Sequence, residues 1–199
     1  MPDISPVNIQ EYVLAIARHE AAHWIVGWRL GASMGAITMR LDHEPGTDSL
    51  RPDCHASGDR LESIKTVPEI EDHLRRRVRA LMAGAIAQLP MNAAATIPEA
   101  MRIWQNEGRD DYAKIREFCQ LLRNIQYGEV DRNTALHQLN EISAALFQAS
   151  VVDVQEAKAA IVELAERMTS AVKEFNRSYV FSTEEIFSLA SVKALFPSP

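Results

Sequence analysis

The chain has 199 residues and a net charge of −6, and 47% of its residues are apolar and 24% charged. This length is typical of one globular domain, so we expect a single domain over residues 1–199. The composition excludes disordered and fibrous proteins. The negative charge gives no general attraction to nucleic acids or anionic lipids, and we expect neither a nucleic acid nor a membrane as partner.

The cysteine count and the lack of long apolar runs exclude further classes of protein. Cys54 and Cys119 are too few for a disulfide framework or an all-thiolate zinc site. The sequence lacks a basic segment followed by an apolar one at its start, and no run of about 18 apolar residues occurs. These features predict a cytoplasmic protein in a reducing compartment.

The first expected elements are a helix, a strand and a loop. Apolar residues recur at three- and four-residue steps from Ile9 to Leu30 and Gly31 follows, which predicts a largely buried helix over residues 8–31. The alternating stretch Ala36–Leu41 predicts one strand without an evident partner. Prolines and glycines among aspartates and serines predict a long, variable surface loop over residues 42–67.

The rest of the chain is expected to be helical. Helical spacing runs from Pro68 to Leu89, from Pro98 to Trp104 and over residues 110–125. The alanine-rich segment 133–196 predicts C-terminal helices, the last opened by a capping box at Ser182 and ending at Leu195. We therefore expect a mainly α fold with a small β element after the first helix.

The first helix carries the pattern HExxH. His19 and His23 are four residues apart, so their side chains share one helical face and can reach the same zinc ion. Glu20 lies beside them and can face an open coordination position as general base. Polar residues in an apolar helix are costly unless they are satisfied, but a pair of hydrogen-bonded core histidines would also satisfy them.

The same residues resemble a known family. The segment RHEAAHWIVGW at Arg18–Trp28 is similar to the zinc helix of FtsH-type membrane-anchored AAA proteases, whose motif is HEAGH with a following Gly-Trp. Ile37–Arg40 resembles the family's next strand, Val78–Ala87 its helix ending in LGGRAAEE, and Val180–Ile186 its terminal turn. The resemblance implies a helical zinc-peptidase domain with Zn²⁺ as cofactor.

The resemblance also implies a third ligand. In that family an aspartate at the start of a later helix binds zinc, within a segment of the form G-A-x-[ND]-D-[LI]. Here the segment is GRDDYAKI at Gly108–Ile115, which implies Asp111 as ligand and Asp110 as the alternative. Without the resemblance, two aspartates at a helix start are explained equally well as caps that offset the helix dipole.

Four departures from the family limit what the resemblance implies. Gln88 and Leu89 stand where the family has paired glutamates, and Ala22 replaces the glycine of HEAGH. Segment 42–67 has little likeness to the family's substrate-binding edge. No G-x-x-x-x-G-K-[ST] phosphate loop occurs, so we expect a stand-alone peptidase domain without the family's ATPase module or membrane anchor.

Two other clusters have simpler explanations. Cys54 and His55 could bind a metal or cap a cleft, but such a pair in a polar loop is more often solvent-exposed. The arginines of segment 75–79 spread around a helix and alternate with acids, which is typical of a solvated face.

The leading hypothesis is a zinc metalloendopeptidase with His19, His23 and Asp111 as ligands and Glu20 as catalytic base. Its substrates would be peptides or unfolded polypeptides, cleaved without ATP. Two alternatives stay open: a non-catalytic, zinc-bound helical module that binds a partner through residues 42–67, and a regulatory protease that cuts one dedicated partner. A homo-oligomer or a partner protein is compatible with each.

Overall fold

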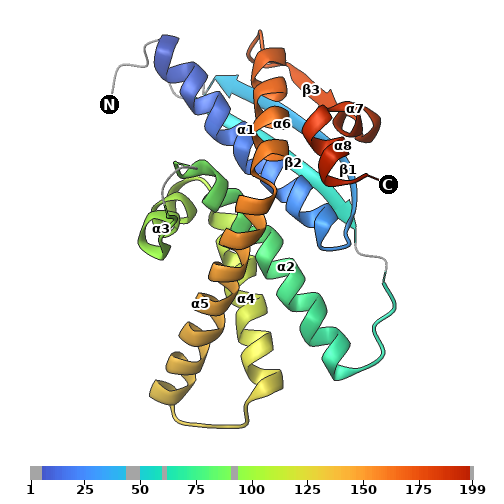
Figure 1. The fold of residues 1–199 in the computed structure, drawn as a ribbon. Helices are drawn as coiled ribbons and strands as arrows, with labels where there is room; N and C mark the ends of the chain where they lie inside the picture. The colour runs from blue at the N-terminus through green and yellow to red at the C-terminus, as the bar shows by residue number, and fades with distance from the viewer. Residues whose placement is uncertain (1–5, 44–49, 60–61, 91–93, 198–199) are drawn as a thin grey trace.

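A computed structural model describes residues 6–43, 50–59, 62–90 and 94–197 (Figure 1). Helices dominate, and a small antiparallel sheet accompanies them, so the mainly helical class with a small β element is confirmed. Within the described ranges, no helix is both long enough and apolar enough to cross a bilayer.

Helix α1 (Pro6–Arg29) agrees with the predicted first helix. Its end is set by Gly31, which adopts the left-handed conformation with φ of 82°. The amide of Gly31 donates to the carbonyl of Trp28, and the amide of Ala32 donates to that of Gly27, each at 2.9 Å. This Schellman motif satisfies the last carbonyls of the helix and turns the chain into the sheet.

The sheet has the order β2-β1-β3, with β1 (Ser33–His43) in the centre, β2 (Leu50–Asp59) on one side and β3 (Ser178–Phe181) on the other. Both pairings are antiparallel. The register of β1 and β2 shifts between Met34 and Ile37. There the indole of Trp24 donates to the carbonyl of Gly35 at 2.6 Å, which fastens α1 to the irregular part of β1.

The loop expected over residues 42–67 is wrong for residues 50–59, because these form β2, and its two ends belong to β1 and α2. Pro52 and Gly58 suggested a loop, but β2 lies at an edge of the sheet, where a proline without an amide hydrogen is tolerated. The parts of this expectation at residues 44–49 and 60–61 lie outside the described residues.

The next three helices match the predicted spacing closely. They are α2 (Val67–Gln88), α3 (Ile97–Asn106) and α4 (Arg109–Gln126). Thr66 and Glu69 form a capping box that starts α2. This box fixes the first turn of the helix by satisfying amides that would otherwise lack partners.

The C-terminal region contains α5 (Arg132–Glu156), α6 (Lys158–Ala171), α7 (Thr183–Ser188) and α8 (Ala190–Leu195). The helices expected over residues 133–196 are confirmed with two corrections. Strand β3 interrupts them, and the last helix is divided at Leu189. The predicted cap at Ser182 is confirmed, since its hydroxyl accepts from the amide of Glu185 at 3.2 Å.

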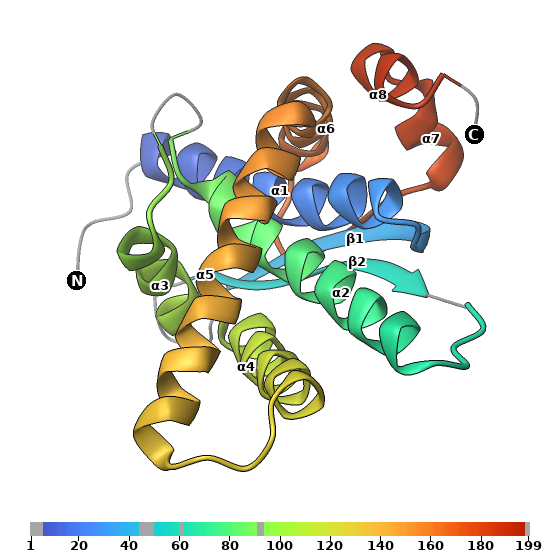
Figure 2. The same ribbon diagram turned by 60° about the horizontal axis from the view of Figure 1, so that its bottom comes forward.

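Helix α1 is the centre of the molecule. One side of α1 packs on the sheet and another on α6, as Figure 2 shows, and α2 packs along it as well. Helices α4 and α5 extend away from this body as a hairpin (Figure 1). The middle of α1 is fully buried at Ala21, Ala22 and Trp24, so the polar side chains there are held within packed structure.

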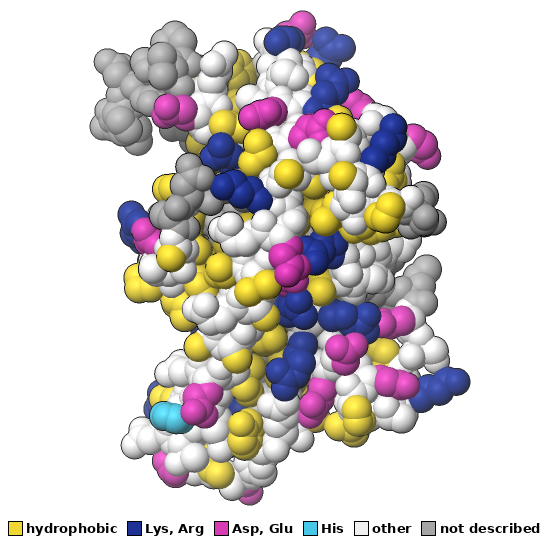
Figure 3. All heavy atoms as spheres, in the orientation of Figure 1, with side chains coloured by type: hydrophobic (Ala, Val, Ile, Leu, Met, Phe, Trp, Pro, Cys, Tyr) yellow, Lys and Arg dark blue, Asp and Glu magenta, His cyan; other side chains and the backbone are white. Residues whose placement is uncertain are grey.

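Two of the α2 arginines, Arg76 and Arg79, depart from the solvated face expected from the sequence, because they form ion pairs. Arg79 binds Asp153 of α5 in a bidentate pair, at 2.7 and 2.8 Å. Arg76 pairs with Glu62 and Asp72. On the face shown in Figure 3, Lys and Arg side chains are interspersed with Asp and Glu side chains.

Candidate metal centre

His19 and His23 come together on the face of α1 that meets α2 and α4. Their Nε2 atoms are 2.9 Å apart, and the two rings meet edge to face. His19 is 8% exposed. The helical spacing of four residues accounts for this convergence, as the sequence predicted.

Asp111 completes a triad with the two histidines. Its Oδ2 atom lies 3.0 Å from Nε2 of His19 and 3.0 Å from Nε2 of His23. Asp110, the alternative ligand, is exposed and does not join the three clustered groups. The N-cap of α4 is Gly108 and no side chain caps it, so capping does not explain the position of the Asp111 carboxylate.

Gly84 of α2 lies directly against both imidazoles. A Cβ atom at this position would be 2.6 Å from Nε2 of His23 and 2.7 Å from Nε2 of His19. Those distances are too short for any side chain, so a glycine is needed for α2 to approach the histidines this closely. Spacing along α2 does not predict a glycine here, because the contact depends on the packing of two helices.

The main chain of α2 sets the orientation of His23. Nδ1 of His23 lies 2.8 Å from the carbonyl oxygen of Ala80, which can only accept, so Nδ1 carries the proton. In the neutral ring Nε2 then carries a lone pair that points at the carboxylate of Asp111. Nε2 and the carboxylate oxygen are both acceptors, so they repel each other. A proton or a metal cation between them removes this conflict, and outer carbonyls of this kind commonly orient metal-binding histidines.

The charges of the triad shift the pKa values of His23 and Asp111 in opposite directions. Burial lowers the pKa of His23, but the charge of Asp111 and the hydrogen bond to it outweigh burial and raise this pKa to about 9. For Asp111, burial raises the pKa, while the two histidines lower it more strongly and hold it well below its usual range. The site therefore attracts a positive charge between its three ligand atoms.

The donor set fits zinc. The three ligand atoms lie within 4.8 Å of one another, and two imidazole nitrogens with one carboxylate oxygen are typical of a catalytic zinc site. Four ligands at about 2.0–2.1 Å from zinc are about 3.3 Å apart in a tetrahedron, close to the separations here. The two histidines differ at Nδ1. Nδ1 of His23 is hydrogen-bonded to the carbonyl of Ala80, whereas Nδ1 of His19 is buried without a hydrogen-bond partner among the described residues.

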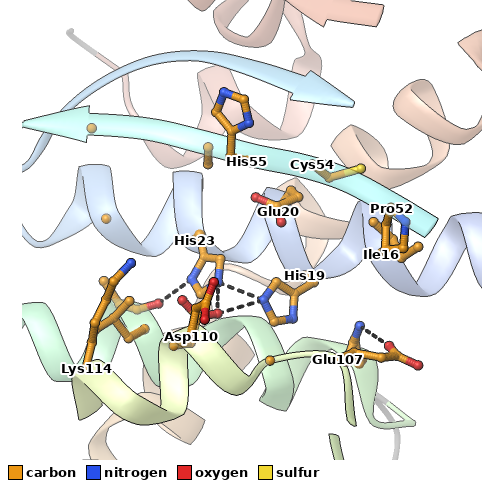
Figure 4. A pocket seen from close by; sticks show the side chains of 18 of the residues that line it. Ile16, His19, Glu20, His23, Pro52, Cys54, His55, Glu107, Asp110 and Lys114 are labelled. Carbon is orange, nitrogen blue, oxygen red and sulfur yellow. Dashed lines mark hydrogen bonds and ion pairs between the residues drawn. The ribbon is translucent and has the colours of Figure 1, made fainter. Parts of the chain in front are cut away.

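Glu20 lies between the triad and β2 (Figure 4). It is 8% exposed, yet its carboxylate has no hydrogen-bond partner among the described residues. Its carboxylate oxygens are not among the buried atoms that lack a partner, so they face the cleft, and no hydrogen bond to the described residues accounts for their position. Its position beside the histidines and outside the three ligands is the one expected for a general base.

A cleft of about 960 Å³ contains the triad. Its walls come from α1, α2, α4 and β2, and Figure 4 shows Pro52, Cys54 and His55 of β2 across from the histidines. Burial raises the pKa of the Cys54 thiol to about 12, and this thiol donates to the carbonyl of Arg40 at 3.6 Å. A protonated thiol is a poor metal ligand, and neither Cys54 nor His55 belongs to the three clustered groups.

No protein-family model matches this chain, and no curated protein matches it at a significant level.

The structure places the sequence-derived site residues in one cleft and adds others. His19, His23, Asp111 and Glu20 all line it. The sequence does not predict three further features of the site: the carbonyl of Ala80, the contact of Gly84 and the wall formed by β2. For Gly84, the only clue was its place in a segment similar to the family's second helix, and a main-chain carbonyl leaves no mark in a sequence.

Proposed function

We propose that this protein is a zinc-dependent metallopeptidase. The observation that carries the proposal is the convergence of His19, His23 and Asp111 from two helices, with the partnerless carboxylate of Glu20 beside them. A hydrogen-bonded histidine pair in a core would need neither the glycine contact at position 84 nor an open cleft in front of it.

Each residue has a distinct role in this proposal. Zinc, when bound, lowers the pKa of a coordinated water to about 7 and polarises a carbonyl group. Nε2 of His19, Nε2 of His23 and Oδ2 of Asp111 would hold the ion. The carboxylate of Glu20 would accept the proton of the attacking water and then deliver it to the leaving amine.

The cleft favours an extended polypeptide as substrate. β2 is an edge strand, and on its outer side no described strand pairs with it. An extended peptide can add to such an edge by main-chain hydrogen bonds, which position the peptide without requiring a particular sequence. The proposed substrates are therefore peptides and unfolded segments of proteins.

Metal content and cleavage test the proposal together. We expect about one zinc per chain in the purified protein, and loss of zinc in both His23→Ala and Asp111→Ala, while the matched control Asp110→Asn keeps it. Glu20→Gln should retain zinc but lose cleavage of an unfolded polypeptide such as reduced casein by a factor of at least 10², the typical contribution of a general base.

Two results would contradict this function in different ways. A protein that stays free of zinc even in excess zinc would rule out the metal centre. A zinc-loaded protein whose peptide cleavage is the same in wild type and Glu20→Gln would leave a zinc-bound interaction module as the explanation.

A further inference from the structure

Two cations stand at one end of the cleft. Arg77 of α2 and Lys114 of α4 both line it. Figure 4 shows Lys114 on the His23 side of the triad, while Glu107 lies on the His19 side. The cleft therefore has two chemically different ends, and the end near His23 carries the positive charge of these two side chains.

Arg77 differs from its neighbours on α2. Arg76 and Arg79 are bound to carboxylates, at 2.6 and 2.7 Å. Arg77 has no carboxylate partner in the described part of the chain, and its guanidinium lies 5.6 Å from the centre of the Phe118 ring. Stacking on this ring holds the group in place while its hydrogen-bond donors remain available.

Lys114 lies on the same helix as the ring on which Arg77 stacks. Phe118 follows Lys114 by one helical turn on α4, so both cations lie on the side of α4 that faces α2. Asp110 is one turn before Lys114, but no ion pair joins them. Lys114 is exposed and, like Arg77, lacks a carboxylate partner among the described residues.

The opposite end of the cleft carries both charges. Glu107 accepts from Gln88 at 3.2 Å, and Arg109 donates to the carbonyl of Gln105 at 2.7 Å. Pro52 lies at this end, and its sequence neighbours Arg51 and Asp53 also line the cleft. The end near His23 holds Asp110 as well as Arg77 and Lys114, but of the two ends it has the two cations without a carboxylate partner, so an anionic group of a ligand is expected there and not near His19.

We propose that Arg77 and Lys114 form a subsite for a carboxylate of the substrate, close to the bond that is cleaved. This inference rests on the proposed peptidase function and names its substrate preference. Arg77 and Lys114 lack a carboxylate partner among the described residues, so each can give a charge-assisted hydrogen bond to a ligand carboxylate, and the planar guanidinium can give two.

The distance of the subsite from the triad follows from helical geometry. Lys114 is three residues after Asp111, and Arg77 is three residues before Ala80, whose carbonyl binds His23. Residues three apart on a helix have Cβ atoms about 5–6 Å apart. An extended peptide advances about 3.3 Å per residue, so the carboxylate belongs to a residue within about two positions of the cleaved bond.

The test uses three short peptide hydroxamates, which bind zinc through the hydroxamate group. One carries glutamate at the second position and an amidated C-terminus, one carries glutamine with the same amide, and one carries glutamine with a free C-terminal carboxylate. Their dissociation constants are measured by calorimetry on the zinc-loaded full chain. The proteins are wild type, Arg77→Met with Lys114→Gln, Lys114→Gln alone, and the control Arg75→Ala, which removes an α2 arginine that does not line the cleft.

We expect at least one of the two acidic probes to bind wild type and Arg75→Ala about tenfold more tightly than the neutral probe. The preference should fall below about twofold in the double variant and be reduced in Lys114→Gln, whose exposed position keeps the fold intact. The acidic probe that wins distinguishes a side-chain carboxylate from a C-terminal one.

Equal binding of all three probes to the zinc-loaded wild type would overturn the subsite and leave the proposed function standing. A preference that survives in the double variant would also overturn it. Absence of zinc from the wild type, measured on the same sample, would instead remove the metal centre and this inference with it.

Discussion

Gly84 shapes the triad without contributing a ligand atom. Because Gly84 has no side chain, the two Nε2 atoms can lie against its backbone, and this contact sets the distance between α1 and α2. An added methyl group would have to displace either the histidines or the helix, because both are held in packed structure.

We therefore predict that Gly84→Ala lowers zinc affinity by a factor of ten or more while the protein remains helical. Competition with a chromogenic chelator measures the affinity, and circular dichroism monitors the helix content. Gly128→Ala is the matched control, since a Cβ there meets nothing within 4 Å. Unchanged zinc affinity in Gly84→Ala would show that the histidines do not need this space.

The raised pKa of His23 predicts the pH dependence of stability when a chelator keeps zinc away. The folded state holds the proton of His23 up to about pH 9, against about 6.5 when unfolded, so this contribution is complete below pH 6.5 and lost as the pH rises to 9. The lowered pKa of Asp111 acts in the other direction, with a contribution lost only in acid. Urea unfolding should give less stability at pH 9 than at pH 6, and His23→Ala should show a smaller difference.

The sequence predicted the triad unevenly. His19, His23 and Glu20 follow from spacing on one helix, which is a local property. Asp111 comes from a different helix far along the chain, so only the family resemblance selected it over Asp110. The charge of Arg77 was visible, but whether an arginine pairs with an acid depends on tertiary neighbours, which spacing along α2 does not specify.

At the scale of elements, the ion pair of Arg79 and Asp153 fixes α2 to α5. Asp153 is 5% exposed, and its two carboxylate oxygens accept from Nε and Nη2 of Arg79. Removing the arginine would leave a buried negative charge without a partner, which is more costly than the loss of an exposed pair.

Arg79→Ala should therefore lower the free energy of unfolding by about 3 kcal/mol. The control Arg167→Ala removes an exposed pair with Glu185 and should cost at most about 1 kcal/mol. Urea titrations of both variants measure the difference. Similar losses in the two variants would mean that the Asp153 carboxylate finds water or another donor.

Helices were predicted well from the sequence and strands poorly. A helix of three or more turns shows its period within one segment, as α2 and α4 do. β2 and β3 form by pairing with β1 on its two sides, where Ile37 lies opposite both Ala56 and Phe181. Such long-range pairing overrides the turn-forming residues of β2, and the short β3 has no period of its own to detect.

For the whole molecule, the triad is the main connection between α1 and α4, which make few other contacts in the described residues. A cation bound by His19, His23 and Asp111 would link α1 to α4, next to the point where α2 contacts the histidines. Zinc at about 100 times its dissociation constant adds about 2.7 kcal/mol of stability, and we expect the melting temperature to rise by about 5–10 °C. Thermal scans with zinc and with chelator measure this, and Asp111→Ala should show no zinc-dependent rise.

The central position of α1 also has a consequence for synthesis of the protein. This helix is synthesised before its partners, because its apolar sides are covered by α6 and the strand beside it is completed only when β3 pairs with β1. At about 5–20 residues per second, the nascent helix waits on the order of ten seconds for these partners. During that time its two tryptophans lack their packing partner Phe187, and the candidate metal centre cannot form before Asp111 of α4 has been synthesised.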